Sequence, residues 1–209
     1  MDSVFDLLRE IPLFQGASSD ALASVAGSTK FDFRKYGAGD VVCHVGDPCV
    51  EISFIISGEV RAIWMDEERN VSVAQTLGAP ASIASEFLFG RSTQMPYTVM
   101  ALTPVSLLAI SKRDFINILS RDNVFLFNFL NFLSSRAQEG LTPSRGDSGL
   151  TIEEKIVEKV KRFSLRNATN ITLSCRKGTL APFLGISDAE LAEAVGNLGS
   201  GSLNELTID

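Results

Sequence analysis

Cysteine and histidine are the residue types in this chain that are best suited to redox or metal chemistry, and they are few. Cys43 and Cys49 flank the turn Gly46-Asp47-Pro48, so they could face each other across a hairpin, and the one histidine of the chain is His44. Such a thiol pair is compatible with redox sensing, but two inert cysteines are the commoner outcome where nothing lowers a thiol pKa. No CxxC or Cys/His cluster has the spacing of a metal site. No nucleophile–base pair is visible either, so we expect a protein that is not an enzyme.

The composition is that of an ordinary globular protein with an acidic balance. The 209 residues suffice for one large domain or two small ones, and 45% are hydrophobic. The formal net charge of −6 argues against broad non-specific binding of nucleic acid. With Cys175 the chain has three cysteines and no signal peptide, which indicates a reduced, cytoplasmic protein. The longest apolar stretch, Val124–Leu133, is too short to span a bilayer, so we expect no membrane partner.

Glycine-marked turns separate short apolar segments in the first third of the chain. Gly-Asp pairs at 39–40 and 46–47 supply left-handed backbone geometry and a local side-chain acceptor. Predicted helices at 4–11 and 19–26 precede the β region, which runs from about 31 to 110. The alternating apolar segments predict these strands: Val41–Cys43, Ile52–Ile56, Val60–Trp64, Ser72–Leu77, Thr98–Leu102 and Ser106–Ile110. Short strands at regular turns predict a compact antiparallel roll.

The apolar period changes from two to 3.6 after the β region. Ser111-Lys112-Arg113-Asp114 predicts a helix start, and the stretch Arg121-Asp122-Asn123 predicts a break before a second helix. That second helix carries an apolar stripe made of Phe125, Phe129, Phe132 and Leu133. Such a stripe is buried against its own domain or against a partner helix.

The last part of the chain has the marks of a separate small domain. The Gly/Pro/Ser-rich residues 141–150 predict a linker between a domain at 1–140 and one at 151–209. Thr151-Ile152-Glu153-Glu154 fits a capping box, with a helix to about Arg166 and a strand at 171–174. Helices at Leu180–Leu184 and Asp188–Leu198 have the spacing of a helix-turn-helix with a glycine turn. The short tail after Leu198 leaves room for a minimal two-stranded wing.

The order of these parts resembles the CRP/FNR family of bacterial transcription regulators. The match rests on the glycine turns, on Ile56-Ser57-Gly58-Glu59-Val60 in the roll, and on 180–187 at the start of the helix-turn-helix. The resemblance implies an α+β fold: an N-terminal double-stranded β-helix or jelly-roll domain of the cyclic-nucleotide-binding type, a long connecting dimerisation helix, and a C-terminal winged-helix-like helix-turn-helix domain. It also implies a homodimer that binds DNA in response to a small-molecule effector.

The effector motif departs from the pattern of family members that bind cyclic AMP. Those members carry a Gly-Glu pair and a later Arg-Ser pair; here Ser85 and Glu86 stand at the first pair, and Met95 and Pro96 stand at the second. Arg91 lies on the loop between them, so the resemblance implies an effector pocket around these five residues. A buried cyclic phosphate without the arginine lacks its charge-assisted hydrogen bonds, and we expect that cyclic AMP does not bind. Glu86 is either a ligand group or a salt-bridged acid in a turn.

Haem and iron–sulfur sensing, which occur elsewhere in the family, have little support. There is no N-terminal cysteine cluster, and a lone histidine such as His44 is more often a half-exposed strand residue than an axial ligand. We therefore expect neither cofactor and leave the effector unassigned.

The predicted recognition helix is acidic where the family places arginine. No Lys or Arg occurs from Gly178 to Asp209, although cations supply most DNA affinity and the commonest base contact. Carboxylates need neighbouring cations to be held in the groove. Two functions stay open: a DNA-binding regulator, and a sensor or protein-interaction module of the same fold that has lost sequence-specific DNA binding. The residues that the resemblance places near DNA are Arg176, Lys177, Thr179, Ser187, Asp188, Glu190 and Glu193.

Overall fold

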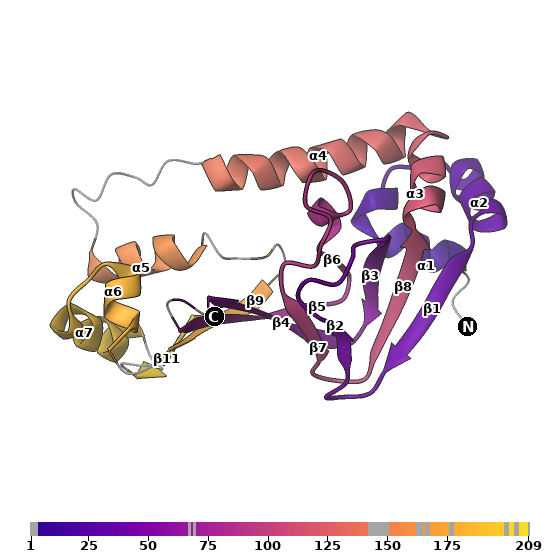
Figure 1. Cartoon of the computed structure of the whole chain (residues 1–209). Coiled ribbons are helices and arrows are strands. Elements are labelled where there is room, and N and C mark those ends of the chain that lie inside the picture. The colour runs from indigo at the N-terminus through magenta and orange to yellow at the C-terminus, as the bar shows by residue number, and fades with distance from the viewer. Residues whose placement is uncertain are drawn as a thin grey trace.

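Two helices and a roll of short strands form about the first half of the protein, up to Ser111 (Figure 1). The computed structural model describes residues 4–66, 68, 70–141, 151–161, 165, 168–175, 178–198, 201–202 and 205–208. Helix α1 (Val4–Glu10), the 3-10 helix η1 (Pro12–Phe14) and helix α2 (Ser19–Ser28) open the chain. The strands of the roll follow as β1 (Phe31–Tyr36), β2 (Val41–Cys43), β3 (Glu51–Ser57), β4 (Glu59–Asp66), β5 (Val71–Gly78), β6 (Ala81–Ile83), β7 (Thr98–Ala101) and β8 (Val105–Ser111).

The strands pair antiparallel in two sheets, as the jelly-roll prediction requires. One sheet has the order β1-β8-β3-β6, and β5-β4-β7-β2 follow one another in the other. The six predicted strands are confirmed within about two residues at each end. Strand β6 was not predicted as a strand, because Ala-Ser-Ile carries fewer β-branched residues than the equally short Val41–Cys43.

The turn between β3 and β4 requires a glycine at position 58. Gly58 has a φ of +86°, and a Cβ built on it would lie 2.3 Å from the carbonyl oxygen of Pro104. Only glycine has both the left-handed freedom and the missing side chain that this close approach requires.

Helices α3 (Lys112–Leu119) and α4 (Asn123–Leu141) follow the roll, and α4 crosses its top in Figure 1. The predicted helix start is confirmed, because Ser111 Oγ accepts the Asp114 N–H at 3.1 Å. The phenylalanine stripe packs on its own domain: Phe125 and Phe129 are buried in the core that also holds α1, α2 and α3.

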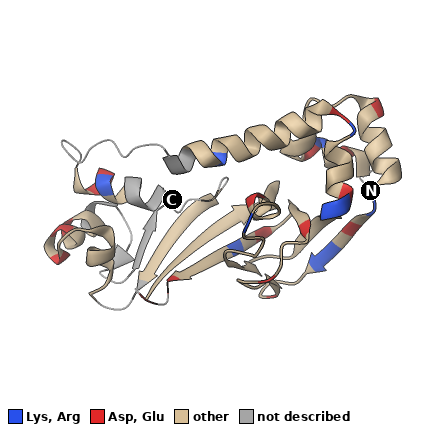
Figure 2. Cartoon of the chain, turned by 45° about the horizontal axis from the view of Figure 1, so that its top comes forward, with Lys and Arg blue, Asp and Glu red and all other residues tan. Residues whose placement is uncertain are grey.

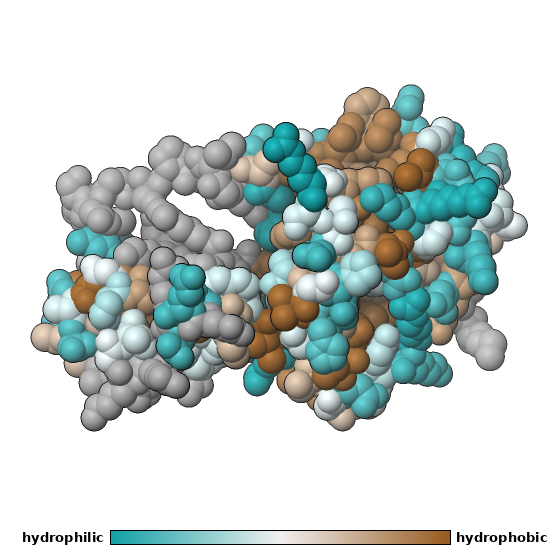
Figure 3. Space-filling view, viewed as in Figure 1, coloured by the Kyte–Doolittle hydropathy of each residue, from teal (hydrophilic) through white to brown (hydrophobic). Residues whose placement is uncertain are grey.

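The opposite face of α4 carries apolar side chains that the described chain covers only in part. Leu126, Phe127 and Leu130 are exposed, and Figure 3 shows hydrophobic residues gathered over the first half of this helix.

The C-terminal unit consists of short elements around a small core of its own. Helix α5 (Ile152–Lys161) starts with the predicted capping box, in which the Thr151 N–H donates to Glu154 Oε2 at 2.9 Å. The predicted extension of this helix to Arg166 includes residues outside the described ones, as do residues 142–150 of the predicted linker. The remaining elements are β9 (Ala168–Cys175), α6 (Leu180–Leu184), α7 (Asp188–Leu198), β10 (Gly201–Ser202) and β11 (Glu205–Ile208).

A continuous sheet joins this unit to the roll. Strand β9 pairs antiparallel with β5, with Val73 opposite Leu173 and Leu77 opposite Ala168, and β11 pairs with the other edge of β9. The second sheet therefore runs in the order β10-β11-β9-β5-β4-β7-β2. Val71 and Val73 of β5 are buried in one cluster with Leu173 and residues of α5, α6 and α7. Among the described residues, no helix is both long enough and apolar enough to cross a membrane.

Candidate effector-binding site

A cavity of about 320 Å³ lies between the roll, η1 and α4. Its volume is at the lower end of the range of small-molecule sites, and such sites combine an apolar wall with a few polar groups. The polar side chains of the described lining come from the residue after η1, from β6 and η2, from Tyr97 just before β7, and from α4. The described lining residues are Pro12, Leu13, Gln15, Ile52, Phe54, Leu77, Pro80, Ala81, Ser82, Ser85, Glu86, Tyr97, Asn128, Phe129, Asn131, Phe132, Ser135, Arg136 and Leu165.

A strained turn brings Ser85 and Glu86 to this cavity. Ala84 has the left-handed φ of +47°, which is uncommon for a residue with a side chain, and its N–H donates to Tyr97 Oη at 3.1 Å. The turn ends β6 and starts the 3-10 helix η2 (Ser85–Phe87). Ser85 is 3% exposed, and its hydroxyl has no hydrogen-bond partner among the described residues. A buried hydroxyl without a partner is costly, so a ligand that bonds to it would gain affinity.

Glu86 is paired with an arginine that the sequence analysis did not identify. Arg136 on α4 places Nη2 3.2 Å from Glu86 Oε1, and both side chains are about one fifth exposed. The expected alternative of a salt-bridged acid therefore describes Glu86 in this structure. A signal for Arg136 was present: it is the one Lys or Arg in α4, four residues after Phe132 on the inward stripe.

Tyr97 lies beside this pair in a nearly closed environment. Burial raises the pKa of Tyr97, and the nearby Glu86 carboxylate raises it further. The phenol is therefore neutral at neutral pH and serves as a hydrogen-bonding group in the cavity wall.

Three of the five expected effector residues lie elsewhere. Arg91 is exposed, and neither it nor Met95 nor Pro96 belongs to the described lining of the cavity. Backbone hydrogen bonds hold Met95 against a different loop, because its N–H donates to Asp47 O at 2.8 Å and its carbonyl accepts from Gly46 at 2.9 Å. Of the five expected residues, Ser85 and Glu86 therefore belong to the described lining of the cavity, and the other three do not.

The two cysteines of the roll have the properties of unreactive thiols. Burial raises the pKa of Cys43 to about 12 and also raises the pKa of Cys49. Cys49 Sγ instead lies 3.3 Å from Met95 Sδ. A thiol with a raised pKa forms little thiolate at neutral pH, which argues against redox sensing here.

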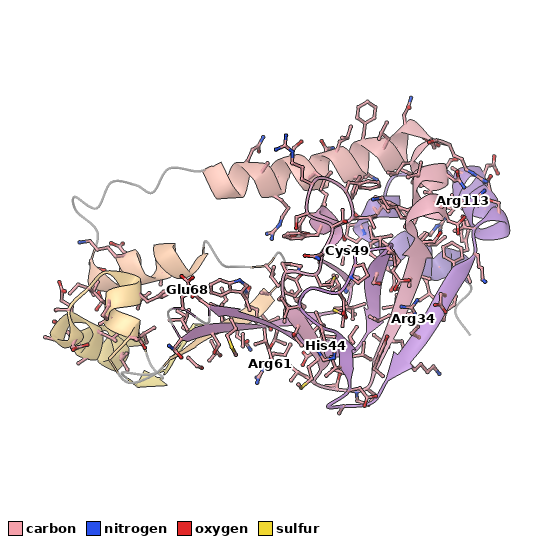
Figure 4. All side chains as sticks on the ribbon, viewed as in Figure 1. Arg34, His44, Cys49, Arg61, Glu68 and Arg113 are labelled. Carbon is pink, nitrogen blue, oxygen red and sulfur yellow. The ribbon has the colours of Figure 1, made fainter. Side chains whose placement is uncertain are left out.

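His44 follows β2 on the exposed side of the roll. Its backbone N–H donates to Asp47 Oδ2 at 2.7 Å, and Figure 4 shows it with Cys49 on the roll. Within the part of the chain that the structure describes, no three His, Cys, Asp or Glu side chains are grouped so that they could hold a metal ion.

The acidic residues of α7 have different local roles. Glu190 belongs to a capping box, because its carboxylate accepts from the Ser187 N–H at 2.8 Å and its own N–H donates to Ser187 Oγ at 3.2 Å. These bonds lower the pKa of Glu190. Asp188 and Glu193 are exposed, and in Figure 2 the helix carries acidic but no basic residues. Thr179 precedes α6 and is half-buried.

The two basic candidates, Arg176 and Lys177, lie outside the described residues. The structure therefore leaves their expected contact with DNA as a prediction.

Comparison with known proteins agrees with the fold of the roll. Residues 33–122 match the sequence model of the cyclic nucleotide-binding domain. They form a domain of that type. No curated protein matches the chain at a significant level.

Solved structures similar to this chain include the sensor domain of the transcriptional regulator DNR from Pseudomonas aeruginosa. It is 20% identical, with a TM-score of 0.54 over 67% of this chain and 98% of that chain. The catabolite activator protein of Thermus thermophilus is 20% identical, with a TM-score of 0.53 over 93% of this chain and 92% of that one. The N-terminal domain of a transcriptional regulator from Streptomyces coelicolor A3(2) is 26% identical, with a TM-score of 0.50 over 68% of this chain and all of that one.

Proposed function

We propose that this protein is a transcription regulator of the CRP/FNR type, a dimer whose DNA binding responds to a small molecule in the cavity. The observation that carries the proposal is the cavity between the cyclic nucleotide-binding domain and α4, with the Glu86–Arg136 pair in its wall. A ligand there touches the roll and the long helix together. It can therefore favour one arrangement of the two over another, which is the requirement for a population shift.

The exposed face of α4 supports the dimer. Leu126, Phe127 and Leu130 lie along one side of the helix and are 36%, 59% and 45% exposed. Burying them against the same face of a second copy would remove this apolar surface from water. Because each side chain is already partly buried, the gain for each is about half of the roughly 1.5–3 kcal/mol that full burial of an exposed side chain contributes. A symmetric pair of α4 helices is the arrangement that this face fits.

Cyclic AMP is expected not to bind with useful affinity. Arg136 is the one Lys or Arg of the described lining, and Glu86 already neutralises it, so a cyclic phosphate would meet no uncompensated cation. Isothermal titration calorimetry with cyclic AMP on the full chain should give no heat of binding at micromolar concentrations. A micromolar or tighter dissociation constant that is lost in Arg136→Met would contradict this expectation and would assign the phosphate to Arg136.

DNA binding is expected to be weak in the parent and stronger after a charge change on α7. The exposed carboxylates of Asp188 and Glu193 would lie close to phosphates if α7 enters the major groove. Replacing both by arginine should tighten binding to duplex DNA at low salt and steepen its salt dependence by about 0.9 per added phosphate contact in log–log terms. Gel-shift titration against genomic fragments over a range of salt concentrations measures both.

A matched control separates a local contact from the change in net charge. Glu10→Arg with Asp20→Arg makes the same charge change at exposed positions of α1 and α2. This control should leave the salt slope near that of the parent. Tight, specific binding by the parent that is lost on mutation of α7 would show instead that the carboxylates contact bases.

The alternative of a sensor without DNA binding is not favoured by the similar structures, since two of them belong to transcriptional regulators. The same gel-shift titration decides between the two functions. If neither the parent nor the α7 variant shifts any fragment at low salt, the result would support a sensor without DNA binding.

A further inference from the structure

The C-terminal unit contributes a wall to the candidate effector cavity. Leu165, which lies between α5 and β9, is part of the described lining and packs against the core of the roll. Its N–H donates to Gln75 Oε1 at 2.6 Å, and Gln75 is a buried residue of β5. The position of Leu165 is therefore set by how the start of β9 lies on β5.

Strand β5 contributes residues both to the lining of the cavity and to the C-terminal core. Leu77 near its end lines the cavity and stands opposite Ala168 of β9. Val73 on the same strand is buried in the C-terminal core, opposite Leu173. The cavity wall and the attachment of the C-terminal unit thus share one pair of strands.

We propose that the occupant of the cavity controls how firmly β9 is held on β5, and that Leu165 is the contact that couples them. This proposal rests on the proposed role of the cavity as an effector site. An occupant that packs on Leu165 has that wall only while β9 is docked, so it binds the docked arrangement more tightly and shifts the equilibrium towards it. By reciprocity, weaker docking of β9 lowers the affinity of the occupant by the same factor.

A side chain built into the cavity can take the place of the unidentified effector. Ser135 on α4 lines the cavity, and its neighbour Ser134 is exposed. Hydrogen exchange of the full chain, followed by mass spectrometry, should show slower exchange of the β9 amides by about threefold or more in Ser135→Leu, because local opening must then expose additional apolar surface. Ser134→Leu adds the same atoms outside the cavity and should leave β9 unchanged.

Removing the proposed contact should have the opposite effect. Leu165→Ala should speed exchange of the β9 amides by about tenfold or more while β3 and β8 keep the exchange of the parent, since the lost packing lies at the junction. Ile116→Ala, a similar large-to-small substitution at an exposed position of α3, is the control. The fluorescence of Trp64, the one tryptophan, gives an independent measure of how β9 is docked on β5. Its side chain packs against both the roll core and the C-terminal core.

The double variant with Ser135→Leu and Leu165→Ala tests directly whether Leu165 couples the cavity to β9. If Leu165 couples the cavity to β9, the slowing caused by Ser135→Leu disappears in the Leu165→Ala background. Slowing that persists there would overturn the proposal, and so would parent-like exchange of β9 in Leu165→Ala. That second result is informative even if Ser135→Leu does not fold. None of these measurements uses an effector, so their failure would contradict the coupling through Leu165 and would leave the proposed role of the cavity as an effector site to be tested separately.

Discussion

Replacing Phe125 by alanine is expected to lower the free energy of unfolding by about 3–5 kcal/mol, as for other large-to-small changes in a closed core. Phe125 is completely buried, and its ring meets that of Phe14 edge-on with 5.5 Å between centroids. Phe14 belongs to η1, whose Pro12 and Leu13 line the cavity, so it cannot close the space without moving that wall. Urea denaturation followed by circular dichroism measures the change, and the dependence on urea should stay near that of the parent.

Phe127 is the matched control two positions along the same helix. Its ring is 59% exposed, so Phe127→Ala should change the unfolding free energy of the isolated chain by no more than about 0.5 kcal/mol. The same variant should weaken self-association in sedimentation equilibrium, because Phe127 lies on the proposed dimer face. Equal losses of stability in the two variants would mean that the inward face of α4 is misassigned. A parent protein that sediments as a monomer at micromolar concentration would contradict the proposed dimer.

Gly58→Ala is expected to destabilise the roll far more than Gly46→Ala, although both glycines have a φ of +86°. The left-handed backbone costs an alanine about 1–2 kcal/mol at either position. At Gly58 the new methyl group also meets the Pro104 carbonyl oxygen at 2.3 Å, whereas nothing lies within 4 Å at Gly46. Overpacking of this kind adds about 1–3 kcal/mol, and the difference between the variants isolates it.

Thermal and urea denaturation of the two glycine variants give this difference directly. Similar losses in both would show that the β3–β4 turn shifts easily away from Pro104. A larger loss in Gly46→Ala would contradict the close approach altogether.

Local signals explain which parts of the fold were predictable. The six strands, the helix start at Ser111 and the capping box at Thr151 follow from turn residues and side-chain periodicity within a few positions. The bounds of α6 and α7 were predicted correctly for the same reason, since Gly185 ends α6 in the left-handed conformation. Their role as a DNA-binding motif stays a prediction.

Contacts between distant segments explain what the sequence analysis missed. Arg136 meets Glu86 across 50 residues, and this pairing depends on how α4 crosses the roll. The pairing of β9 with β5 joins positions about a hundred residues apart, such as Ser72 and Ser174. No local pattern encodes that register. The resemblance also grouped Arg91, Met95 and Pro96 with Glu86, whereas the hydrogen bonds of Met95 tie that loop to the Gly46 turn.

The pairing of β9 with β5 also covers an edge of the second sheet. Without β9, the N–H and C=O groups along one side of β5 would be unpaired, and an open edge of this kind is a template for strands of other chains. During synthesis β5 leaves the ribosome long before β9, so this edge stays open while α3, α4 and α5 are made. The C-terminal unit therefore covers the last open edge of the roll. A chain cut between α4 and α5 would be prone to aggregate through β5.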